Sequence, residues 1–118
     1  MNARAVRWSI RLAQAAERDF REIYEWTVSR FGTAQAEIYE NAMVLTIEAL
    51  QGGPMVVGVK VRDEIAAGLL SIQVRIERRK GRHFVFFRVS GTAREIVVLR
   101  ILHVAMDPAR HVTGQPKT

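Results

Sequence analysis

Residues 70–77 (LSIQVRIE), 83–89 (HFVFFRV) and 95–103 (EIVVLRILH) decide the fold. The first run alternates apolar and polar residues, which is typical of a strand with one buried face. The other two runs are apolar on both faces, which favours strands that are central or covered. Short links with turn residues, at 79–82 around Lys80 and Gly81 and at 91–94, join the runs. The three runs therefore predict an antiparallel meander.

Upstream of the meander, the period of the apolar residues changes twice. Residues 6–12 alternate like a strand, and residues 13–31 carry one helical stripe that ends before Gly32. A second helix should follow, ending at residues 52–54 (GGP). Its expected apolar stripe comprises Ile38, Ala42, Leu45 and Ala49, widened by Tyr39, Met43 and Leu50. Residues 55–68 read as a connecting loop with a short helical turn at 62–67.

The predicted class is α+β, with the order β-α-α-β-β-β in two layers. A helical hairpin should cover one face of an antiparallel sheet. In the last strand, Val97, Leu99 and Ile101 are the expected core face. Residues 1–112 are predicted to form a single domain and residues 113–118 a flexible tail.

Composition excludes several kinds of chemistry. The 118 residues contain no cysteine, so thiol nucleophiles and disulfides are ruled out. The three histidines lie far apart, and the pattern predicts neither a metal site nor a cofactor. The apolar stretches are too short for a signal peptide core or a membrane span. We therefore expect a cytoplasmic protein without a membrane partner.

The charge is positive and unevenly placed. The net charge is +6, and the excess of cations lies after residue 51. Most of the cations are arginine, whose planar guanidinium suits carboxylates and phosphates. This balance predicts an anionic partner, either a nucleic acid or an acidic protein segment.

Three stretches in this order resemble the ParE/RelE toxin superfamily over about residues 6–112. They are AERDFREIYEWT at 16–27, HFVFFRV at 83–89 and EIVVLRILHVAMDPARHV at 95–112. The last stretch is similar to the ending of the ParE branch. The resemblance implies the toxin of a type II toxin–antitoxin pair, neutralised by a ParD-like antitoxin, with operator DNA contacted only through that antitoxin.

The two branches of this superfamily imply different functions. ParE-type toxins inhibit DNA gyrase, whereas RelE-type toxins cut mRNA on the ribosome with basic residues and, commonly, a tyrosine near the C-terminus. The only tyrosines here are Tyr24 and Tyr39, at apolar positions of the predicted helices. This departure favours the ParE branch and a protein without catalysis of its own, with a RelE-like mRNA endonuclease as the alternative. A toxin that retains only antitoxin binding is a third possibility.

Arginines on the three predicted strands are the first candidate site. Strand parity allows Arg75, Arg88 and Arg100 to share one sheet face, where they would bind an acidic antitoxin or, in a nuclease, phosphate. In the nuclease alternative His103 would be the general base. The competing interpretation is ordinary solvated arginines and a histidine that closes a strand end.

Three further features are candidates for partner contact. Trp26 is either a flank of the core or an anchor for the antitoxin. Arg79, Lys80 and Arg82 form a basic hairpin tip, which contacts the target or is simply solvated. Residues 106–111 match the family ending, so a target contact is carried over to them. The residues of this segment that we assign to the target contact are Met106, Asp107 and Arg110. The alternative for the segment is a turn that caps the core.

Overall fold

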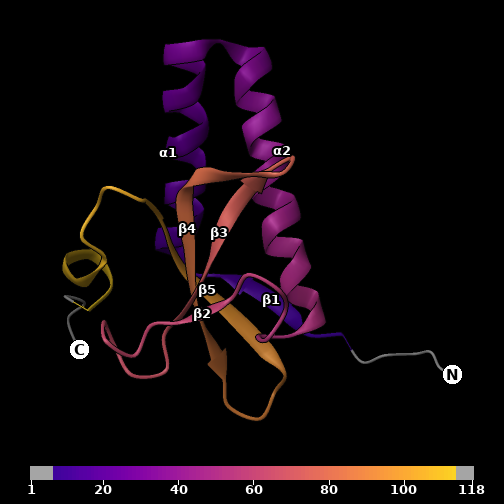
Figure 1. Ribbon diagram of the computed structural model, residues 1–118, viewed down its shortest axis with the longest axis vertical. Helices are drawn as coiled ribbons and strands as arrows, with labels where there is room; N and C mark the ends of the chain where they lie inside the picture. The colour runs from indigo at the N-terminus through magenta and orange to yellow at the C-terminus, as the bar shows by residue number, and fades with distance from the viewer. Residues whose placement is uncertain (1–6, 114–118) are drawn as a thin grey trace, which may run out of the picture.

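Two long helices stand against a five-stranded sheet in the computed structural model, which describes residues 7–113 (Figure 1). The elements are β1 (Ser9–Leu12), α1 (Gln14–Phe31), α2 (Thr33–Ala49), the 3-10 turn η1 (Leu50–Gly52), β2 (Lys60–Val61), β3 (Leu70–Ile76), β4 (Arg79–Ser90), β5 (Glu95–His103) and the π-helical turn η2 (Ala109–Thr113). The predicted order and two-layer class are confirmed, with the short β2 added inside the predicted loop. Val6 of the predicted first strand and residues 114–118 of the predicted tail lie outside the described residues, and Thr113 belongs to η2.

A single residue separates the two helices. Gly32 has a φ of 92°, in the left-handed region that favours glycine. Its N–H donates to the Val28 carbonyl at 2.9 Å, and its own carbonyl accepts from the N–H of Ala36 at 3.1 Å. Gly32 thus ends α1 and begins α2, which makes the hairpin tight. Within the described residues, no helix is long and apolar enough to cross a membrane.

The sheet has the strand order β1-β5-β4-β3-β2. The meander β3-β4-β5 is antiparallel, as predicted, but β1 pairs parallel with β5, starting with Ser9 opposite Glu95. The expectation of an antiparallel sheet is therefore wrong at this edge. The reason is the order of the strands. The meander ends with β5 beside β1, and β5 runs in the same direction as β1.

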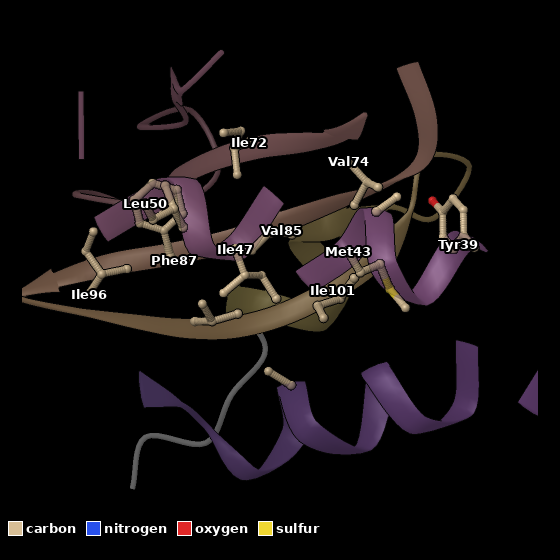
Figure 2. Close-up of a cluster of buried hydrophobic side chains, with 13 residues drawn as sticks. Tyr39, Met43, Ile47, Leu50, Ile72, Val74, Val85, Phe87, Ile96 and Ile101 are labelled. Atoms are coloured by element: carbon tan, nitrogen blue, oxygen red, sulfur yellow. The ribbon is translucent and has the colours of Figure 1, made fainter. Parts of the chain in front are cut away.

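The main core lies between the helical hairpin and one sheet face (Figure 2). α2 contributes Met43 and Ile47, and η1 contributes Leu50. They pack in one cluster with Val85 and Phe87 of the central strand β4. Most of these side chains are almost completely removed from water. Burying each contributes roughly 1.5–3 kcal/mol, so this layer is the main source of stability.

The prediction for the second helix is confirmed in part. Of the expected apolar residues, Tyr39, Ala42, Met43 and Leu50 are buried, whereas Ile38, Leu45 and Ala49 are exposed. Ile47, which the prediction did not include, is also buried. The apolar arc of α2 is wider than the face that the sheet covers, and the covered face is the one that contains Met43.

The expected core face of β5 is likewise confirmed only in part. Ile101 is in the main core as expected, but its neighbours there are Ile96 and Val98 instead of Val97 and Leu99. Leu99 packs against a second cluster on the opposite sheet face. The register between β4 and β5 shifts at this point: Phe87 is opposite Val98, and Phe86 is opposite Arg100. Leu99 is therefore the extra residue of a bulge, which reverses the alternation of the side chains that follow.

The second cluster covers the sheet face away from the helices. Its buried members are Leu69, Phe86, Leu102 and Val112. Val112 comes from the C-terminal segment, which folds over this face beside the loop before β3. Both faces of β4 are thus covered, as its doubly apolar sequence predicts.

The turn between β3 and β4 lies earlier than expected. Ile76 pairs with Arg79, so Glu77 and Arg78 form the loop, and Glu77 has a φ of 58°. The predicted turn at 79–82 is wrong, because Lys80 and Gly81 belong to β4. The second turn is confirmed: Ser90 pairs with Glu95 around residues 91–94.

Candidate functional site

A groove opens where the outer halves of the two helices pass the tip of the β3–β4 hairpin. Its cavity volume is about 660 Å³. The helices supply one wall, with Trp26, Thr27, Phe31, Gln35, Ile38 and Tyr39, and the hairpin supplies the other, with Ile76, Glu77, Arg79, Lys80, Gly81, Arg82 and His83. One wall is therefore largely apolar and the other carries three cations.

Tyr39 and His83 join the two walls. The Tyr39 hydroxyl accepts the N–H of Arg82 at 3.1 Å and lies 2.8 Å from Nδ1 of His83. Burial, and to a lesser degree the neighbouring His103, lower the pKa of His83 to about 4, so its ring is neutral at pH 7. Burial raises the pKa of Tyr39, so this hydroxyl keeps its proton at neutral pH. The tautomer of His83 decides which of the two groups donates the hydrogen bond.

Gly81 allows this close approach. A Cβ at position 81 would lie 3.0 Å from the Tyr39 hydroxyl and 3.0 Å from the Val74 carbonyl. Contacts that short are tight, so a side chain would push the hairpin away from α2. The small residue at 81 thus holds the two walls of the groove at their spacing.

His103 belongs to the same cluster but lies outside the lining of the groove. It pairs with His83 across β4 and β5, with the ring centroids 5.3 Å apart. Its Nδ1 accepts the N–H of Ala105 at 3.0 Å. This contact orients the ring and leaves Nε2 as the remaining polar atom, which suits a histidine that closes a strand end.

Arg100, one of the three arginines of the predicted cluster, forms an ion pair within the molecule. Its Nε and Nη2 donate to the two carboxylate oxygens of Asp19 at 2.7 and 2.9 Å, and the same carboxylate accepts the N–H of Ile101 at 2.9 Å. Asp19 is 8% exposed. Hydrogen bonding to Asp19 raises the pKa of Arg100. The forked geometry is that of a structural ion pair.

Asp19 takes the place of a missing strand. β1 ends at Leu12, and the next amide, that of Ala13, still donates to the Val98 carbonyl at 2.8 Å. Beyond this point no strand among residues 7–113 lies beside the outer edge of β5, and the Asp19 carboxylate accepts the N–H of Ile101. Nη1 of Arg100 also donates to the His111 carbonyl at 3.3 Å, which ties η2 to the same point.

The other two arginines lie apart from each other. Arg75 is exposed opposite Lys80, near the hairpin tip, whereas Arg88 donates to the Ala67 carbonyl near the other end of β4. Arg88 follows Lys80 by eight positions on β4, which corresponds to roughly 26 Å along the strand. A single cluster of Arg75, Arg88 and Arg100 is therefore not formed.

The structure brings the remaining candidates toward one end of the sheet. Trp26, Arg79, Lys80 and Arg82 all line the groove. The C-terminal segment begins beside it, since the N–H of Val104 donates to the Arg82 carbonyl at 2.9 Å.

The other target-contact candidates follow in this segment. Met106 and Arg110 are exposed, and a carboxylate oxygen of Asp107 accepts the N–H of Ala109 at 3.1 Å. Val112 anchors the end of the segment in the second cluster. The segment therefore caps the core and also presents exposed side chains.

Tyr39, His83, Ile38 and Asp19 were missed as site residues from the sequence. Tyr39 and Ile38 sit in an apolar pattern that predicts core for both. The approach of His83 to Tyr39 depends on a register that sequence does not reveal. Asp19 carried one signal, because an acidic residue on an otherwise apolar stripe is expected to have a buried partner.

A family model described as the ParE toxin of the type II toxin–antitoxin system parDE matches residues 10–108. Toxin ParE1 of Mycobacterium tuberculosis is 32% identical over 101 residues, covering 86% of this chain and 94% of that protein. Toxin ParE1 of Caulobacter vibrioides is 32% identical over 103 residues, covering 86% of this chain and 95% of that protein.

Two solved structures of toxin–antitoxin systems have the same fold as this chain. A chain of the chromosomal ParDE toxin–antitoxin system from P. aeruginosa superposes with a TM-score of 0.62 at 25% identity, covering 85% of this chain and 99% of that one. A chain of the RelBE2 toxin–antitoxin complex of M. tuberculosis shares the fold, with a TM-score of 0.56 at 23% identity over 83% of this chain and 99% of that one. The chain belongs to the ParE toxin family of type II toxin–antitoxin systems.

Proposed function

We propose that this toxin acts by binding DNA gyrase and that a ParD-like antitoxin holds it inactive until it is needed. An action without catalysis is supported by one observation: the residues expected in a nuclease site lie apart or are held by other contacts. Arg100 is held by Asp19, and His103 accepts a backbone N–H. Arg75, on β3, lies opposite one end of β4, whereas Arg88 lies near the other end of β4. Cleavage of RNA would require a base and phosphate-binding cations around one reacting atom.

The antitoxin part is supported by the similar proteins. The P. aeruginosa structure is of a ParDE toxin–antitoxin system, and its toxin-like chain matches nearly end to end. The positive net charge of +6 fits an acidic partner. In this proposal operator DNA is contacted through the antitoxin, and the exposed target-contact candidates are Arg79, Lys80, Arg82, Met106, Asp107 and Arg110.

Expression of the chain alone tests the proposal. We expect DNA synthesis to stop before protein synthesis, and the purified toxin to inhibit supercoiling by gyrase. Arg110→Glu and Met106→Ala should weaken the inhibition without changing the melting temperature. A matched control is Arg18→Glu, an exposed change on α1 outside this segment. Arrest of translation with cleaved mRNA, and no effect on supercoiling, would reject the proposal.

A ribosome-dependent endonuclease is the second candidate. One observation favours it: a neutral His83, hydrogen-bonded to Tyr39, lies in the lining of a groove that also contains Arg79, Lys80 and Arg82. His83→Gln then separates the two functions. If the toxin cuts RNA through this group, the substitution should remove mRNA cleavage. If the toxin inhibits gyrase, supercoiling should stay inhibited.

A further inference from the structure

The end of the β3–β4 hairpin carries a high density of positive charge. Residues 75–82 (RIERRKGR) contain one acid, Glu77, and five cations. The cations are all exposed, and they are Arg75, Arg78, Arg79, Lys80 and Arg82. Within residues 7–113 none of them forms an ion pair with a carboxylate. Like charges without an acidic partner repel one another, and a bound anion would remove this repulsion.

Two of these cations face each other directly. Arg75 of β3 is the cross-strand partner of Lys80 of β4. The side chains of such partners leave the sheet on the same face, with their Cβ atoms about 5 Å apart. Like charges at this spacing destabilise a strand pair, whereas opposite charges would stabilise it. A local loss of stability of this kind is typical of a functional site.

The pair points away from the helices. Arg75 lies between Val74 and Ile76, which both pack in the core under the helices. Because successive side chains of a strand point to opposite faces, Arg75 belongs to the other sheet face, and its cross-strand partner points the same way. The two charges therefore lie on the sheet face of the second cluster.

Arg82 adds a third cation to this face. It lies between Gly81 and His83, which both face Tyr39 of α2. Alternation therefore directs the Arg82 side chain away from the helices, although its backbone N–H donates to the Tyr39 hydroxyl. The resulting basic patch, named the sheet-face patch, comprises Arg75, Lys80 and Arg82.

The surroundings of the sheet-face patch favour one kind of anion. The ring that follows the patch on this face of β4 is that of Phe84, and it already has two neighbours. The Arg62 guanidinium lies 5.1 Å from its centre, and the Phe86 ring meets it edge to face at 5.9 Å. The exposed rings of the groove lining belong to the helices. The patch therefore offers charge to a ligand but little ring surface on which an unpaired base could stack.

We infer that the sheet-face patch binds the phosphate backbone of duplex DNA. A duplex keeps its bases stacked inside and presents phosphates, which suits a surface of guanidinium and ammonium groups without an open ring. Phosphate contacts carry no sequence information, so the choice of operator stays with the antitoxin. The inference deepens the proposed function and rests on it for the source of the DNA, which is the duplex on which gyrase acts.

The test measures binding of the full chain to a fluorescently labelled duplex of about 20 base pairs, or two helical turns, by fluorescence anisotropy. Two duplexes of unrelated sequence should bind equally well, because backbone contacts do not depend on sequence. The logarithm of the binding constant should fall linearly with the logarithm of the salt concentration. The competitors are an oligouridylate, which represents single-stranded nucleic acid, and polyglutamate, which represents an acidic protein segment.

Neutral substitutions count the phosphate contacts. The double variant Arg75→Gln/Lys80→Gln should weaken duplex binding roughly tenfold and reduce the salt slope by about 2, because each lost phosphate contact contributes about 1. The matched control is Arg18→Gln/Arg21→Gln, which removes two exposed cations from α1 and should leave the binding constant and the slope unchanged.

A charge reversal separates DNA binding from stability. Lys80→Glu should weaken duplex binding, yet it should raise the melting temperature at low salt, because the new carboxylate lies opposite Arg75. A substitution that only disturbed the fold would lower both quantities, and that result would contradict the role of the pair.

The inference is overturned if neither duplex binds, if Arg75→Gln/Lys80→Gln binds like the parent, or if Arg18→Gln/Arg21→Gln weakens binding equally. Displacement of the duplex by oligouridylate or polyglutamate more effectively than by unlabelled duplex would assign the patch to that competitor and also overturn it. Supercoiling tests the target separately. A chain that binds the duplex without inhibiting gyrase keeps this inference and rejects the proposed target, whereas a chain that inhibits gyrase but binds no duplex rejects this inference alone.

Discussion

The inner and outer halves of the helical hairpin have similar apolar content but different surroundings. The inner half places Ala16, Met43 and Ile47 against the sheet, with little or no exposure. The outer half leaves Trp26 and Ile38 about half exposed. The difference arises because β3 turns back at Glu77 and Arg78, before the helices end. Apolar residues of the inner half that face the sheet thus stabilise the fold, whereas Trp26, Phe31 and Ile38 of the outer half are exposed and available to a partner.

The largest expected effect comes from placing a negative charge in each half of α2 and comparing the loss of stability. Met43→Glu should prevent cooperative folding, because burying an unpaired carboxylate costs several kcal/mol out of a net stability of about 5–15 kcal/mol. Ile38→Glu should lower the free energy of unfolding by less than about 1 kcal/mol. Urea denaturation monitored by circular dichroism measures both. Equal losses would mean that the outer half belongs to the core.

The ion pair at the inner end gives the next largest effect. Asp19→Ala should lower the free energy of unfolding by roughly 3–5 kcal/mol, because the Arg100 guanidinium and the Ile101 amide lose their shared acceptor. Glu25→Ala, an exposed acid on the same helix, is the control and should change it by less than about 0.5 kcal/mol. If both variants unfold at the same urea concentration as the parent, the contacts of Asp19 do not stabilise the edge of β5.

The junction between the halves should respond to pH through His83. Its pKa is about 4 in the folded chain, below the ordinary value of 6.5, so the unfolded chain binds the proton first as the pH falls. Stability should be full above pH 6.5, fall between pH 6.5 and 4, and level off below.

His83 is partly accessible to solvent, so we expect its share of this fall to be on the order of 2 kcal/mol. The measurement compares melting temperatures of the parent and of His83→Gln between pH 7 and pH 4. The variant should lose this part of the slope, whereas His111→Gln should keep it. A parent and a His83→Gln chain with the same slope would show that another group is responsible.

Period and turn residues were enough to predict the meander, the helical hairpin and the two-layer class. They failed where one extra residue in a strand reverses which of the following side chains face the helices. The bulge at Leu99 moves Ile101 to the helix side and Leu99 away from it, and no residue type in EIVVLRILH marks that shift. The wide apolar arc of α2 likewise left two possible buried faces, and only packing against the sheet selects the one with Met43.

Only part of the site was predicted, because the sequence shows the types of residues but not how the helices and strands meet. The cations of the hairpin tip and Trp26 were identified from the sequence, because exposed charge runs and a lone tryptophan at the border of a stripe are visible there. Their meeting in one groove was not, since it depends on how far the helices extend past the sheet. The arginine trio failed because parity gives the face of a strand but neither the distance along it nor the partner that Asp19 provides for Arg100.

The parallel pairing of β1 with β5 also bears on when the toxin can become active during its synthesis. Ser9 and Glu95 meet in the sheet although most of the chain lies between them. The helical hairpin depends on local contacts and can form early, but the sheet cannot be completed before its last strand leaves the ribosome. Since β5 lies between β1 and β4, a partly made chain has a split sheet. The complete sheet, on which any activity of the folded toxin depends, therefore forms only after Glu95–His103 have been translated.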